Sequence, residues 1–205
     1  MAEAGRQELC LCRSLNSGPR PQLIPAGFLA KTVLARPDWL QNSAVFDIFS
    51  VSNCISKDFC DYIRHWKHNG YWMFNSPDAI RDITVTESID LSQTRLFYYE
   101  VYERQFVEER KEWIAFESER EFETNVLVPG QRQLEGYDVV TFSVQTSPEC
   151  SPLSCNRLAE SIAVNRHCLL ASLEDAKRHI ESGLFDNKCE PGPFRIFAVF
   201  SCAAI

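Results

Sequence analysis

RLFYYEVY, residues 95–102, has the clearest secondary-structure signal in this chain of 205 residues. Aromatic and β-branched residues dominate it, and these residue types favour strands because their side chains pack well on a pleated surface. A second stretch rich in apolar residues, FRIFAVFS, occupies residues 194–201 near the C-terminus. Both stretches are therefore predicted to be strands of a β-sheet.

The rest of the chain alternates between strand patterns and helix patterns. Ser172 stands before an apolar run, and Asp175 follows at the spacing of a helix capping box. Apolar residues at helical spacing after Ser56 predict another helix. Further strands are expected at 28–35, 44–51, 137–144 and 168–171, a hairpin at 106–116, and helices at 56–69, 78–83, 157–162 and 172–182. These elements predict an α+β fold, in which three to four helices pack on a mixed or mainly antiparallel sheet.

Length and composition indicate one folded domain. The chain is 45% hydrophobic and 12% aromatic, which is enough apolar material to fill a core. Residues 1–26 differ, because they combine Gly, Ser, Pro and Arg without apolar periodicity. We therefore expect a flexible or loosely docked N-terminal arm over 1–26 and a single α+β domain over 27–205. No internal repeat is apparent in the sequence.

Charge and cysteine usage restrict the class of protein. The formal net charge is −7, whereas nucleic-acid-binding domains normally carry a basic face. No apolar run is long enough for a membrane span, and the N-terminus lacks the apolar core of a signal peptide. Nine cysteines are an odd number, which fits free thiols in a reducing compartment better than a disulfide framework. We expect a cytoplasmic protein without nucleic-acid or membrane partners.

The common catalytic signatures are missing from the sequence. Its eight glycines include no G-x-G pair, so neither a dinucleotide-binding fingerprint nor a P-loop is present. The motifs H-E-x-x-H, G-x-S-x-G and C-x-x-C are also missing. Candidate sites must therefore come from less specific features.

The segment SPECSPLSCN, residues 147–156, is the first candidate site. Its prolines and serines predict a rigid loop between a strand and the start of a helix. Free backbone N–H groups and the helix dipole lower the pKa of a thiol in such a position. Cys150 or Cys155 is then a candidate nucleophile, and His167 is the nearest candidate base in the sequence. One hypothesis is therefore a thiol-dependent hydrolase or transferase.

The same region also allows a metal site. Cysteine and histidine are the side chains that zinc prefers. The candidate ligands are Cys150, Cys155, His167, Cys168 and Cys189, whose spacing is irregular for a zinc-binding motif. In a third interpretation the cysteines have no catalytic or metal-binding role. They fill small apolar gaps, and the stiff loop forms the rim of a ligand pocket.

Acidic residues concentrate around the expected hairpin. Residues 100–123 contain nine glutamates and four lysines or arginines, a local charge of −5. Such a surface can keep strand edges from pairing with other molecules, or it can attract a basic partner. The candidate binding residues are Glu108, Glu109, Glu112, Glu117, Glu119 and Glu121.

The favoured hypothesis combines the two features. It describes a binding or protein-interaction module that uses the acidic hairpin and the rigid cysteine loop to hold a basic protein or a small ligand. The thiol-dependent enzyme and the zinc-binding domain are the alternatives.

Overall fold

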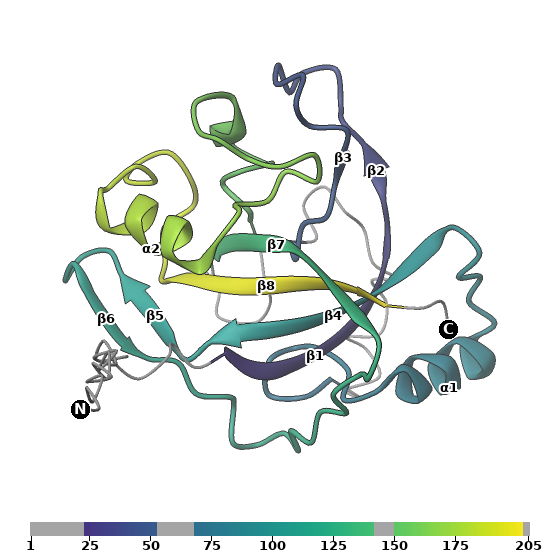
Figure 1. Cartoon of the computed structure of the whole chain (residues 1–205). Coiled ribbons are helices and arrows are strands. Elements are labelled where there is room, and N and C mark those ends of the chain that lie inside the picture. The colour runs from purple at the N-terminus through teal and green to yellow at the C-terminus, as the bar shows by residue number, and fades with distance from the viewer. Residues whose placement is uncertain (1–22, 53–67, 142–149, 203–205) are drawn as a thin grey trace, which may run out of the picture.

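A computed structural model describes residues 23–52, 68–141 and 150–202. Its main feature is an antiparallel sheet of six strands (Figure 1), in the order β1-β4-β8-β5-β6, with β7 paired to β8 as well. The strands are β1 (Leu23–Thr32), β4 (Thr94–Tyr102), β5 (Arg104–Val107), β6 (Glu112–Ala115), β7 (Arg132–Thr141) and β8 (Phe194–Cys202). A separate short pair is formed by β2 (Leu34–Ala35) and β3 (Asp47–Ile48).

Two α-helices, α1 (Pro77–Glu87) and α2 (Leu173–Glu181), are found within the described ranges. The fold there is mainly β, so the expected α+β fold with three to four helices is wrong. Ser76 and Ser172 cap the two helices, because each side chain accepts a hydrogen bond from a backbone N–H in the first turn. None of the helices within those ranges is long and apolar enough to cross a membrane.

The missing helices have different explanations. The helix expected at 157–162 is only a 3-10 turn, Leu158–Glu160. Arg157, just before it, has a left-handed backbone with φ 63°, and an α-helix cannot extend through that conformation. The helix expected at 56–69 lies outside the described residues, except for His68 and Asn69.

Some of the expected strands are present in the structure and others are shorter or missing. The strands at 95–102 and 194–201 are confirmed as β4 and β8, and the hairpin is confirmed as β5 and β6. The strand expected at 44–51 is reduced to β3. The strand expected at 168–171 is a single bridge between Leu170 and Tyr137. Both segments are short apolar runs that pack on the sheet without becoming strands of it.

The sheet has an approximate internal two-fold symmetry. β1 pairs with β4 and β7 pairs with β8 in matching register, and a bulge in each outer strand precedes a glycine, Gly27 or Gly136. These glycines lie opposite Tyr99 and Val199, which in turn pair with each other where β4 meets β8. Such a pairing of equivalent segments has the geometry of a two-fold dimer interface.

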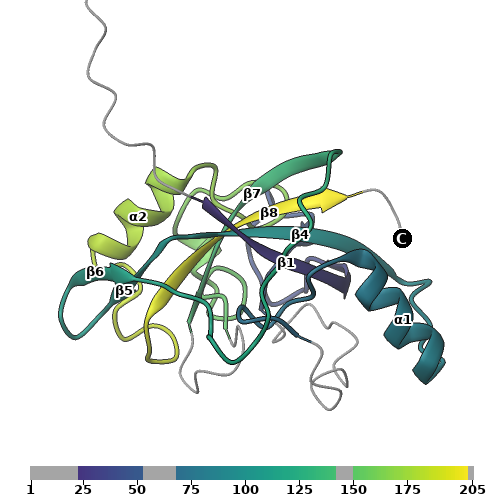
Figure 2. The same cartoon turned by 90° about the horizontal axis from the view of Figure 1, so that it is seen from below.

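A turn built on asparagine repeats in the two halves. In each turn the asparagine side chain donates its Nδ2 to a carbonyl next to the bulge glycine, Asn69 to Ala26 and Asn165 to Glu135. The Oδ1 atom of each asparagine accepts two backbone N–H groups of its own turn. A serine-capped helix follows each turn, and α1 and α2 lie at opposite ends of the sheet in both views (Figures 1 and 2).

Candidate functional site

The structure brings the two cysteines of the predicted loop together. The Cys150 thiol is buried and forms hydrogen bonds with Cys155 and with the side-chain oxygen of Asn156, the latter at 3.1 Å. Cys155 is half-buried, and its sulfur lies 3.9 Å from the hydroxyl of Ser52. The backbone N–H of Thr141 donates to the Cys150 carbonyl, which attaches the loop to the end of β7.

The surroundings of these thiols oppose ionisation. The hydrogen bond with Cys155, together with burial and the proximity of Glu190, raises the pKa of the Cys150 thiol. Burial raises the pKa of Cys168 to about 12, and the nearby Asp138 and Cys155 add to the shift. Burial likewise raises the pKa of Cys189 to about 12. Nucleophilic cysteines and zinc ligands must be thiolates, so the shifts disfavour both chemistries.

His167 is held by other partners. Its Nδ1 contacts Asp47, and its Nε2 lies 3.6 Å from a carboxylate oxygen of Glu135. The imidazole also stacks on Phe49, with 4.0 Å between the ring centroids. The other carboxylate oxygen of Glu135 accepts a hydrogen bond of 2.5 Å from Ser201. Asp47, Phe49 and Glu135 belong to no sequence motif, and only the fold brings them to the histidine.

The five cysteine and histidine residues proposed as zinc ligands do not form one cluster. Cys150 and Cys155 are in contact, whereas the imidazole of His167 contacts Asp47 and Glu135. The Cys189 thiol donates to the carbonyl of Phe185. Over residues 23–52, 68–141 and 150–202, no group of three or more His, Cys, Asp or Glu side chains could hold a metal ion.

A buried polar network lies next to the cysteine loop. Asp138 is fully buried in β7, and its carboxylate accepts hydrogen bonds from Ser50 (3.0 Å), the backbone of Val51 (2.9 Å) and Ser151 (2.6 Å). Lys31 is fully buried in β1, and its ammonium donates to the Val51 and Ser52 carbonyls, both at 2.8 Å. Burial raises the pKa of Asp138 to about 6, although the three hydrogen bonds and the charge of Lys31 oppose the shift.

The six glutamates proposed as binding residues form a surface that we call the acidic surface. Glu108, Glu109 and Glu112 belong to the β5–β6 hairpin, and Glu117, Glu119 and Glu121 follow it. All of them are exposed except Glu108, which is half-buried. Arg110 pairs with Glu112 at 3.4 Å and Arg120 with Glu117 at 3.1 Å. In the described part of the chain, no ion pair involves the other four.

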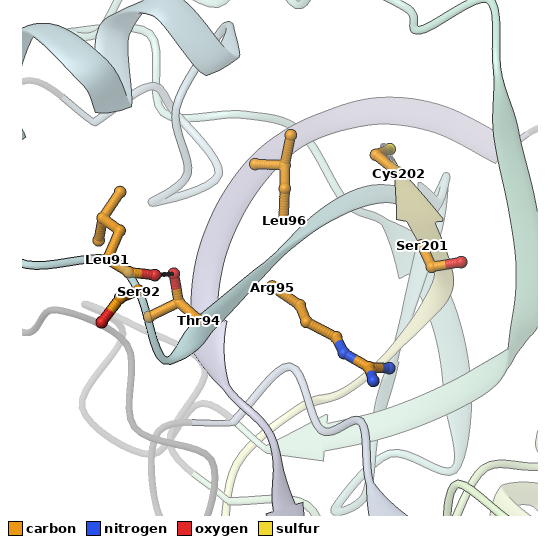
Figure 3. Close-up of a pocket in the computed structure, with 7 residues that line it drawn as sticks. All are labelled: Leu91, Ser92, Thr94, Arg95, Leu96, Ser201 and Cys202. Atoms are coloured by element: carbon orange, nitrogen blue, oxygen red, sulfur yellow. Dashed lines mark hydrogen bonds between the residues drawn. The ribbon is translucent and has the colours of Figure 1, made fainter. Parts of the chain in front are cut away.

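Two pockets are each lined by an arginine, and the two arginines are equivalent in the two-fold symmetry. Arg95 of β4 lines a pocket of about 690 Å³ (Figure 3) together with Leu91, Ser92, Thr94, Leu96, Ser201 and Cys202. Arg195 of β8 lines a pocket of about 250 Å³, together with Trp72, Gln105, Phe116, Glu117, Glu119 and Pro193. The second pocket therefore contains two glutamates of the acidic surface.

The raised thiol pKa values predict slow alkylation of the folded protein. Cys150 and Cys168 are expected to react with iodoacetamide near neutral pH at least about 100-fold more slowly than in the urea-unfolded chain, because both burial and the scarcity of thiolate protect them. Mass spectrometry of tryptic peptides over a time course measures the rates. Fast labelling of Cys150 in the folded protein would contradict this expectation and restore the thiol-enzyme hypothesis.

Three groups of side chains are thus candidates for function: the acidic surface, the arginine pockets and the polar network beside the cysteine loop. The network is buried, whereas the first two face solvent or a pocket. Comparison with protein-family models, with curated proteins and with solved structures finds no match for this chain.

Proposed function

We propose that this protein is an interaction module whose acidic surface binds a basic segment of a partner protein. The observation that carries the proposal is the set of four exposed or half-buried glutamates, Glu108, Glu109, Glu119 and Glu121, for which the described part of the chain provides no ion pair. Exposed carboxylates without an ion pair attract cations and increase the rate of association with a basic partner.

The pocket beside the acidic surface supports the same proposal. Glu117 and Glu119 line it together with the rings of Trp72 and Phe116. A lysine or arginine side chain can lay its aliphatic part on an aromatic ring while its charge meets a carboxylate. The guanidinium of Arg195 already covers Phe116, with 4.1 Å from Cζ to the ring centroid. A cation of the partner is therefore expected at Trp72 and the two glutamates.

Charge reversal in the acidic surface is expected to weaken binding to a fluorescein-labelled oligolysine peptide. The variant Glu109→Lys with Glu121→Lys should raise the dissociation constant at least about tenfold in roughly 0.05 M salt, and by less in roughly 0.5 M salt, because salt screens exposed charges. Fluorescence anisotropy measures the affinity.

A matched variant separates local binding from net charge. Asp38→Lys with Asp82→Lys changes the total charge equally, and both aspartates are exposed outside the acidic surface. This control is expected to bind the peptide with nearly the affinity of the wild type. Equal losses in the two double variants would mean that only the net charge matters, and the proposed interaction site would be wrong.

A further inference from the structure

Cys150 and Cys155 are two free thiols in direct contact. Neither cysteine is in a disulfide, and a hydrogen bond joins their side chains. A disulfide forms only where two cysteines face each other at short range, because it links Cβ atoms about 4 Å apart. The fold therefore brings these thiols into the arrangement from which a disulfide can form.

Hydrogen bonds of the surrounding chain hold the pair in place. At the start of the loop, the N–H of Thr141 in β7 donates to the Cys150 carbonyl at 2.9 Å. At its end, the N–H of Cys155 donates to the Ser151 carbonyl at 2.8 Å. The Ser151 hydroxyl in turn donates to the buried carboxylate of Asp138 at 2.6 Å. Because both cysteines are anchored, the effective concentration of one thiol at the other is high.

The two thiols differ in access to solvent, and this difference sets the order of reaction. Cys155 is half-buried, whereas only 2% of Cys150 is exposed. The hydroxyls of Ser52 and Ser154 lie 3.9 and 4.0 Å from the Cys155 sulfur, where they can donate to it when it loses its proton. A small disulfide from solution is therefore expected to react with Cys155 first.

We propose that Cys150 and Cys155 are an oxidation site that forms a disulfide by exchange with a small disulfide such as oxidised glutathione. In the first step the Cys155 sulfur attacks one sulfur of the glutathione disulfide. The bond between the two glutathione sulfurs breaks, and a mixed disulfide forms at Cys155. The displaced glutathione leaves as a thiolate and takes up the proton that Cys155 has lost.

The second step occurs within the protein. The first of the causes that raise the pKa of Cys150 is its hydrogen bond with the Cys155 thiol, and this cause disappears once Cys155 carries glutathione. The proton of Cys150 passes to the carboxylate of Glu190, to which the thiol is also hydrogen-bonded. The Cys150 sulfur then attacks the sulfur of Cys155 and displaces the second glutathione, which takes up this proton. The protein loses two electrons and two protons, and one oxidised glutathione becomes two reduced ones.

The redox equilibrium of the full-length protein tests the site. The protein is equilibrated with mixtures of reduced and oxidised glutathione, in buffer and in urea, and free thiols are then blocked with N-ethylmaleimide under denaturing conditions. At a fixed concentration of reduced glutathione, the folded protein should need at least about tenfold less oxidised glutathione for half-formation of the disulfide, because the unfolded chain brings the thiols together only by chance. An equal requirement in both states would overturn the site, and so would no disulfide in the folded protein.

Trypsin locates the bond. Cys150 and Cys155 lie in one tryptic peptide, residues 133–157, whereas Cys168 lies in another, residues 167–177. The proposed disulfide therefore appears in mass spectrometry as the loss of two hydrogen atoms from a single peptide, which carries no maleimide. Cys168 is the competing partner, because it is close enough to Cys155 to be affected by its charge. A cross-link between the two peptides would assign the bond to Cys168 and refute the proposed pair.

Three substitutions test the order of the two steps. Cys150→Ser should accumulate glutathione at Cys155, because no second thiol can displace it. Cys155→Ser should acquire glutathione at Cys150 at least about tenfold more slowly, since that thiol is enclosed. Cys189→Ser is the matched control, because it removes another half-buried cysteine, and it should form the disulfide as the wild type does. Thermal unfolding verifies that each variant is folded. Equal rates of adduct formation in the first two variants would refute the order. This site is independent of the acidic surface, so either proposal can fail without the other.

Discussion

Replacing Asp138 by alanine is expected to lower the free energy of unfolding at neutral pH by roughly 3–5 kcal/mol. The carboxylate is fully buried and accepts hydrogen bonds from Ser50, Val51 and Ser151. Without it, three buried donors lose their acceptor, and the charge of buried Lys31 loses its counter-charge. Urea unfolding followed by tryptophan fluorescence measures the loss. Asp82→Ala, at an exposed position on α1, should change stability by less than about 0.5 kcal/mol.

The pH dependence of stability tests the same residue in a second way. Burial raises the pKa of Asp138 from 3.8 to about 6, so the folded protein binds more protons than the unfolded chain between these values. The stabilisation from this proton uptake is full below pH 3.8 and is lost as the pH rises through 6. Between pH 4 and pH 6.5, the stability of the wild type relative to Asp138→Asn should fall by up to about 3 kcal/mol. A rise over this range would show that the charge of Lys31 outweighs burial.

The features of the fold that could be predicted from sequence were those with a local signal. The aromatic and β-branched residues of 95–102 identify β4, and Ser172 with Asp175 identifies the start of α2. Apolar runs without such a signal were misassigned. Residues 168–171 were predicted to be a strand, but Leu170 forms only a bridge to Tyr137. The turn built on Asn165 bends the backbone around this segment.

Long-range features had no local signal at all. Lys31 and Asp138 come close because segment 50–52 lies between β1 and β7 and binds both side chains. Cys150 and Cys155 are in contact, but His167, the candidate base, contacts Asp47 and Glu135 instead of either candidate nucleophile. Side chains that meet only through sheet topology leave no pattern in a single sequence.

The two-fold symmetry could not be recognised from the sequence either, because few residues are identical between the two halves. Arg-Leu-Phe at 95–97 corresponds to Arg-Ile-Phe at 195–197, and Asn69 corresponds to Asn165. Most other equivalent positions differ in residue type, as Lys31 and Val140 do at matching places in β1 and β7. What the halves share is backbone geometry: a bulge, a glycine and an asparagine turn.

The two bulge glycines are therefore expected to respond alike to substitution. Gly27 has φ 141° and Gly136 has φ 149°, which are conformations that side chains strongly disfavour. A Cβ atom would lie 2.7 Å from the Phe74 carbonyl oxygen at Gly27 and 2.8 Å from that of Leu170 at Gly136. These contacts are with backbone held by bridge hydrogen bonds, so neither can relax easily.

Gly27→Ala and Gly136→Ala should each lower the free energy of unfolding by at least about 2 kcal/mol, from backbone strain and from displacement of the facing turn. Gly130 is the matched control, because no heavy atom beyond its two chain neighbours lies within 4 Å of a Cβ placed there, and Gly130→Ala should stay within about 0.5 kcal/mol of the wild type. Chemical denaturation of the three variants provides the comparison. If only one of Gly27→Ala and Gly136→Ala destabilises the protein, the two halves differ in how tightly the turn is joined to the strand. The surroundings of Arg95 and Arg195 could then no longer be treated as equivalent.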